Sequence, residues 1–112
     1  GMGLPSATTD MGVFALERLM EGPAGWRGLT REMALRWPES SAGEIIFALM
    51  SAARTIEAHF LQGGPAHDGA VQGYRLAGMI GLDLYALQVV GISAPKAREL
   101  LDWWEIEGAR DA

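Results

Sequence analysis

The residues best suited to metal binding are two histidines and an aspartate: His59, His67 and Asp68. Neutral imidazole nitrogens and carboxylate oxygens are common metal ligands. We expect His59 on the inner face of one helix and His67 at the start of the next, so the fold could bring them together. However, their spacing across the loop at 63–65 matches no dedicated metal motif. A hydrogen-bonded core histidine beside a loop histidine is the commoner arrangement, so we predict no metal and no cofactor.

A second cluster interleaves basic and aromatic residues: Trp26, Arg27, Arg31, Arg36 and Trp37. Arg27 precedes a predicted helix N-terminus, where free backbone N–H groups attract anions. A phosphate or carboxylate ligand could therefore bind in this segment, held by guanidinium groups. The alternative is a solvated arginine face, in which Arg36 pairs with Glu32 four residues earlier and both indole rings pack inward.

No combination of residue types predicts catalysis. The chain contains no cysteine, which excludes a disulfide scaffold, a thiolate metal site and a cysteine nucleophile. Its serines lie outside any nucleophile-elbow pattern. The Gly63-Gly64 pair lacks the spacing and the Lys-Ser/Thr ending of a phosphate-binding loop. We therefore predict that the protein is not an enzyme.

Composition predicts one globular domain spanning residues 1–112. Apolar residues make up 49% and charged residues 21% of the chain, which is typical of a folded protein. The net charge of −5 opposes nonspecific binding to nucleic acid or to an anionic membrane. No basic stretch precedes an apolar run near residue 1, so we expect a cytoplasmic protein. Eight arginines beside a single lysine suggest a bacterial, GC-rich genome.

Apolar residues recur with helical periodicity, and strand-like alternation is absent, so we predict an all-α fold of four to five helices. Residue types preferred at helix N-termini predict N-terminal caps of four helices at Asp10, Thr30, Ser41 and Ser93. Ser41 with Glu44 forms a capping-box pattern. The predicted helices span about 11–21, 31–37, 42–62, 68–90 and 94–107, with residues 1–9 and 108–112 loose. Gly22-Pro23 ends the first of these helices, and residues 23–28 are predicted to form a loop.

The segment from Leu29 to Leu49 resembles the helix-turn-helix of many bacterial DNA-binding regulators, with a short helix, a break at Pro38 and a second, capped helix. This resemblance implies a recognition helix beginning at Ser41. That helix exposes no Arg or Lys before Arg54, although DNA contacts come mainly from such residues near the start of the helix. A helix-turn-helix regulator with an acidic surface is therefore a minor alternative, and we consider nucleic acid an unlikely partner.

The predicted helix over 68–90 is apolar around most of its circumference, so we expect it at the centre of the fold, surrounded by the others. Its polar residues Gln72, Arg75 and Asp83 fall on one narrow strip. Because Arg75 and Asp83 interrupt it, this helix is a poor membrane span. Small residues recur every four positions and predict close approach of a neighbouring backbone: Gly69, Gly73, Ala77 and Gly81.

The last predicted helix places Trp103 and Ile106 outside its inner stripe. Exposed aromatic and aliphatic residues among acidic ones indicate a contact surface, and the alternative is a wide core that includes Trp103. We predict a non-enzymatic interaction domain, a homodimer that could also bind another protein. The alternative is a regulatory domain that binds a small ligand or anion through residues 26–37.

Overall fold

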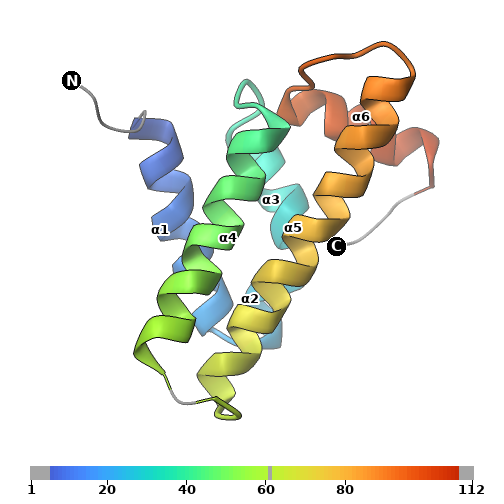
Figure 1. Ribbon diagram of the computed structural model, residues 1–112. Coiled ribbons are helices and arrows are strands. Elements are labelled where there is room, and N and C mark those ends of the chain that lie inside the picture. The colour runs from blue at the N-terminus through green and yellow to red at the C-terminus, as the bar shows by residue number, and fades with distance from the viewer. Residues whose placement is uncertain (1–5, 61, 109–112) are drawn as a thin grey trace.

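The computed structural model describes residues 6–60 and 62–108, and within them the chain forms six helices and no strand (Figure 1). The predicted all-α class is confirmed. Of the residues predicted to be loose, 1–5 and 109–112 lie outside the described part. The prediction is wrong for residues 6–9, which belong to the first helix. The helices are α1 (Ser6–Met20), α2 (Pro23–Trp26), α3 (Leu29–Arg36), α4 (Ala42–His59), α5 (Pro65–Val89) and α6 (Ala97–Ile106).

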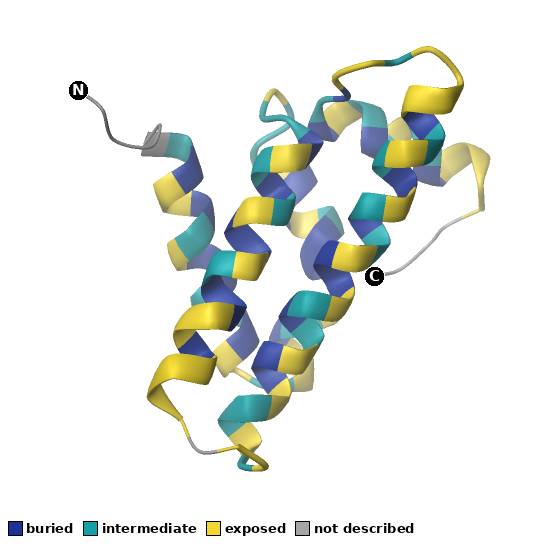
Figure 2. Cartoon of the chain, viewed as in Figure 1, coloured by how far each residue is buried: buried dark blue, intermediate teal, exposed yellow. Residues whose placement is uncertain are grey.

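The three long helices lie side by side, with α4 packed between α1 and α5 (Figure 1). The short helices α2 and α3, together with α6, lie behind this layer, and α3 packs against α6. Buried residues line the sides of the helices that face one another (Figure 2). The prediction that the other helices surround α5 on all sides is wrong. Large apolar residues along the outer side of α5 are exposed.

The capping box at the start of α4 is confirmed. The Glu44 backbone N–H donates to the Ser41 hydroxyl at 3.0 Å, and the Ser41 backbone N–H donates to the Glu44 carboxylate at 3.2 Å. The hydrogen bond from the Ser41 backbone is the main cause that lowers the pKa of Glu44 below its ordinary value. The Thr8 hydroxyl also donates to this carboxylate, at 3.0 Å, and so links α1 to the start of α4.

Three other predicted caps are wrong. Helix α1 begins at Ser6, so Asp10 lies within it. Helix α3 begins at Leu29 after Gly28, whose positive φ of 71° suits glycine, and Thr30 is buried with its hydroxyl unpaired. Helix α6 begins at Ala97, so Ser93 lies in the preceding loop.

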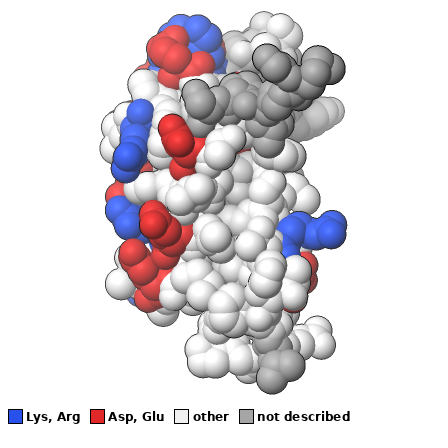
Figure 3. Space-filling view, turned by 90° about the vertical axis from the view of Figure 1, so that its left-hand side faces the viewer, with Lys and Arg blue, Asp and Glu red and all other residues white. Residues whose placement is uncertain are grey.

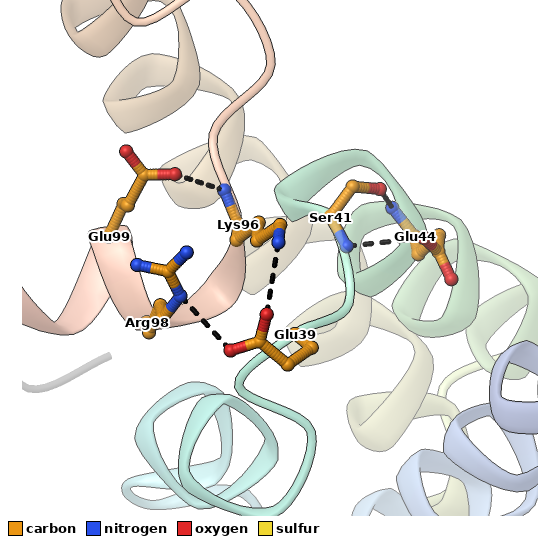
Figure 4. Close-up of polar contacts among 6 residues, drawn as sticks. All are labelled: Glu39, Ser41, Glu44, Lys96, Arg98 and Glu99. Carbon is orange, nitrogen blue, oxygen red and sulfur yellow. Dashed lines mark hydrogen bonds and ion pairs between the residues drawn. The ribbon is translucent and has the colours of Figure 1, made fainter.

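Helix α6 starts late because its first turn docks on the loop before α4 (Figure 4). The Ala97 N–H donates to the Ser40 carbonyl at 2.7 Å, and the Ala42 N–H donates to the Pro95 carbonyl at 2.9 Å. Figure 4 shows Glu39 between Lys96 Nζ and Arg98 Nε, each at 3.0 Å. The hydrogen bond from Lys96 is the main cause that lowers the pKa of Glu39. The first backbone N–H group of α4 and that of α6, which have no acceptor within their own helices, therefore each donate to the segment before the other helix.

The segment predicted as a loop at 23–28 contains the short helix α2, which begins with Pro23 in its first turn. Proline suits this position because the first turn needs no N–H for the helix ladder. The break predicted at Gly22-Pro23 is therefore correct, but it separates two helices directly.

The predicted small-residue ridge of α5 is close-packed over its first half only. A Cβ at Gly69 would lie 2.6 Å from the backbone oxygen of Leu19, and one at Gly73 would lie 3.0 Å from the Ala53 Cβ. Ala77 is buried. At Gly81 a Cβ would meet nothing within 4 Å, so the close packing predicted there is wrong.

Candidate functional site

The predicted anion-binding arginines do not converge on one point. The Arg36 guanidinium lies 5.0 Å from the ring centres of Phe14 and Trp37. The Arg31 guanidinium lies 5.9 Å from the Trp104 ring, on α6. Arg27 is exposed at the C-terminal cap of α2. Two of the three cations therefore cover aromatic rings on different elements, which is a packing role.

Both indole rings of this segment are partly buried against the core, as the inward-packing alternative predicts for Trp26 and Trp37. The predicted pairing of Glu32 with Arg36 is replaced by a contact between helices. Glu32 on α3 accepts from Arg18 on α1, with 3.2 Å between Oε1 and Nε. Arg18 also pairs with Glu21 at 3.3 Å. These are exposed ion pairs, which typically contribute little stability.

The histidines form no metal site. His59 is exposed, contrary to its predicted place on a buried stripe, and its Nδ1 lies 2.8 Å from the Thr55 carbonyl of its own helix. His67 lies in the first turn of α5, followed by the exposed Asp68. Across residues 6–60 and 62–108, no group of three His, Cys, Asp or Glu side chains could hold a metal ion.

Asp83, which the sequence placed on the narrow polar strip of α5, is buried where α5 faces α6. It is 3% exposed, and both tryptophans of α6 donate to it. Trp103 Nε1 donates to Oδ1 at 3.1 Å, and Trp104 Nε1 donates to Oδ2 at 2.9 Å. A buried carboxylate requires such donors, because without them its burial is costly. Asp83 therefore fixes α6 against α5.

This contact changes the interpretation of the predicted α6 surface. Trp103 is partly buried against the core and has a hydrogen-bond partner within its own chain. Ile106 is 76% exposed. Of the two predicted interface residues, only Ile106 therefore offers a largely free side chain.

The largest run of exposed apolar side chains on one helix lies along the outer side of α5, where Figure 2 shows exposed residues recurring along the ribbon. At about 3.6 residues per turn, positions spaced by four and three fall on one line. We call this line the α5 stripe: Val71, Arg75, Gly78, Leu82, Tyr85 and Val89. Leu82, Tyr85 and Val89 are 70%, 69% and 66% exposed.

The spacing of the α5 stripe is visible in the sequence, but its exposure is not. The same helix is apolar on its inner sides as well, so periodicity alone does not separate the side packed within the chain from the outer side. Arg75 is the only charged residue of the stripe, and it donates to Gln72 at 2.9 Å and to the Met79 sulfur at 3.2 Å.

A second, largely apolar surface is the groove between α1 and α4. Two adjoining hollows share Leu16 and Thr55, and together they extend from Thr8 and Phe47 at one end to Phe60 at the other. Figure 3 views the molecule from the side of α1. Uncharged residues fill the centre of this view, and most charged ones gather along one edge. The groove is the alternative contact surface.

The chain matches no protein-family model, no curated protein and no solved structure. In the described ranges, no helix combines the length and apolarity that crossing a membrane requires.

Proposed function

We propose that this protein is a self-associating helical interaction domain rather than an enzyme, and that its contact surface is the α5 stripe. The observation that carries the proposal is the exposure of Leu82, Tyr85 and Val89 on a single line of one helix. Single exposed apolar residues are normal, but a contiguous set is typical of an interaction surface.

The spacing of the stripe supports a helical partner. Alternating steps of four and three residues are the pattern of a coiled-coil seam, in which side chains of one helix insert between those of another. A large aliphatic residue and an aromatic residue, Leu82 and Tyr85, occupy adjacent positions of this seam. Tyrosine is enriched at the centres of protein interfaces.

The size of the chain supports self-association. A chain of 112 residues buries a smaller fraction of its surface than a large domain does. Twofold dimers are the commonest oligomers, and one shared patch on each copy is sufficient to form them. Covering the stripe with the same stripe of a second copy would remove apolar surface from water at both helices.

The two alternative functions have less support. Anion binding through residues 26–37 would need convergent cations, but Arg31 and Arg36 lie over different rings. DNA binding through α4 would need a free N-terminal turn. That turn carries the acidic Glu44, and the backbone N–H of Ala42 already donates to the Pro95 carbonyl in the loop before α6.

Sedimentation equilibrium tests the proposal. We expect the parent to dimerise at micromolar concentration and Leu82→Ser with Tyr85→Ser to be monomeric. Leu35→Ser is a matched control, because Leu35 is also an exposed leucine (62%) but lies on α3. It should dimerise like the parent. A parent that stays monomeric at high micromolar concentration refutes self-association.

The same measurement separates the competing surfaces. If the α5 double variant still dimerises, the stripe is not the contact. Ile106→Ser then tests the predicted α6 surface, and Val13→Ser with Phe47→Ser tests the groove between α1 and α4. All three side chains are at least 47% exposed, so their replacement by serine should leave the fold intact.

A further inference from the structure

We infer that two copies pair through the α5 stripe in antiparallel orientation, about a twofold axis that passes level with residue 80. This inference rests on the proposed function and names its partner and register. The supporting observation is the order of residue types along the stripe. When the stripe of a second copy runs in the opposite direction, the residues that face each other are complementary.

Reversal about position 80 places each stripe residue opposite one specific residue of the second copy. Gly78 faces Leu82, Arg75 faces Tyr85, and Val71 faces Val89. The stripe has two alternating types of seam position, 71, 78 and 85 and then 75, 82 and 89. Each pair combines one position of each type, as in the packing of two antiparallel helices of a coiled coil. The twofold axis generates every pair twice, as an isologous contact requires.

The central pair is complementary in size. Gly78 has no side chain, and a Cβ added there would meet nothing within 4 Å. Leu82 is the most exposed residue of the stripe, at 70%. The open space above Gly78 on one copy can therefore receive the isobutyl group of Leu82 from the other. Two such insertions next to the axis would bring the backbones close together.

The next pair combines a cation with an aromatic ring. The Arg75 guanidinium would lie on the phenol ring of Tyr85 from the second copy, and a cation over an aromatic face is attracted to it. The bonds from Arg75 to Gln72 and Met79 hold this side chain along α5. Tyr85 is 69% exposed, so its ring is available for this contact.

A parallel pairing lacks this complementarity. In register, it places Gly78 against Gly78 and leaves a gap, and it places Arg75 against Arg75, where two like charges repel each other. It also aligns the two helix dipoles in the same direction, which is less favourable than opposing them. The residue order therefore favours the antiparallel pair.

Cysteine crosslinking tests the register, and the parent has no cysteine to interfere. Val71 and Val89 are exposed positions at opposite ends of the stripe. They lie about 27 Å apart within one helix, since each residue adds about 1.5 Å. A bridge between them can therefore form only between two chains.

We expect neither Val71→Cys nor Val89→Cys alone to form covalent dimers on mild oxidation or with a short bis-maleimide. An equal mixture of the two variants should form a covalent heterodimer. Leu35→Cys, mixed with each variant, controls for random collision. Dimers of Val71→Cys alone would show a parallel pair, and a non-covalent dimer without the mixed bridge would show another register. Both results overturn the inference while leaving self-association intact. A monomeric parent overturns the proposed function as well.

A complementation experiment tests the central pair. Gly78→Leu should weaken the homodimer about tenfold or more, because overpacking of a well-packed contact is costly. Its mixture with Leu82→Ala should form a heterodimer tighter than either homodimer. In that heterodimer, each of the two contacts between position 78 and position 82 pairs one leucine with a small residue. A mixture that binds no more tightly than the two homodimers contradicts the Gly78–Leu82 pairing.

Discussion

Helix α5 carries glycines on two sides, and the two sides differ in what lies above them. On the inner side, a Cβ at Gly73 would lie 3.0 Å from side chains of both α1 and α4. On the outer side, a Cβ at Gly78 would meet no atom within 4 Å. Both glycines lower the helix propensity by about 1 kcal/mol relative to alanine. Only the inner one is compensated by packing within its own chain.

A small residue within a helix therefore indicates a closely packed neighbour, but the residue type alone does not show whether that neighbour belongs to the same chain or to another. The inner glycines let α5 approach α1 and α4. The outer glycine lies among exposed Leu82, Tyr85 and Val89, where a second copy is the proposed neighbour. Substitutions on the two sides should therefore have opposite effects on the stability of the monomer.

The largest loss is expected from Asp83→Ala, on the inner side next to α6. The substitution leaves the indole N–H groups of Trp103 and Trp104 without this acceptor. Hydrogen bonds to a charged group contribute roughly 1.5–3 kcal/mol each, so we expect a loss of about 3 kcal/mol or more. Urea denaturation measures it.

Asp102→Ala is the matched control for this prediction, because Asp102 is an exposed aspartate of α6. It should change the free energy of unfolding by less than about 0.5 kcal/mol. Equal effects of the two substitutions would contradict the anchoring role of Asp83.

A smaller loss is expected from Gly69→Ala. Its methyl group would lie 2.6 Å from the backbone oxygen of Leu19, so one of the two helices must move. Overpacking typically costs about 1–3 kcal/mol, and this exceeds the gain in helix propensity. A variant that melts at or above the parent temperature would show that α1 and α5 are not closely packed here.

The sequence predicted much of the fold because its strongest signals are local. The break at Gly22-Pro23 and the capping box of Ser41 with Glu44 depend on neighbouring residues alone. The cap predicted at Ser93 was wrong because a distant contact decides the start of α6. The carbonyls of Pro38 and Ser40 accept from its first turn, and local patterns do not contain that information.

The candidate surface was predicted less well for the same reason. Periodicity placed Trp103 outside the inner stripe of α6, but it did not show that buried Asp83 would accept from its indole. The seam from Val71 to Val89 can be read from the spacing. Its exposure follows from the position of α4 and α6 beside α5, which only the tertiary structure supplies.

An intermediate effect is expected from Ala77→Leu, which extends the inner ridge beyond Gly73. Ala77 is 3% exposed, so the larger side chain must displace its neighbours. We expect a loss of about 1–2 kcal/mol, because leucine and alanine have similar helix propensities and cannot mask the clash. Gly81→Leu is the comparison, since a Cβ there has open space. Thermal melting of both variants should show a lower midpoint for the first alone.

The smallest effect is expected from Gly78→Ala, and its sign is the opposite. The methyl group meets nothing within 4 Å in the monomer, so the substitution should stabilise it by about 0.5–1 kcal/mol through helix propensity. To exclude any contribution from association, the change is made in the Leu82→Ser, Tyr85→Ser background, for which we expect a monomer. Urea denaturation at several protein concentrations measures the gain and checks that it is independent of concentration. A loss of stability at Gly78 would mean that the outer side of α5 is packed within its own chain, and the contrast between its two sides would then fail.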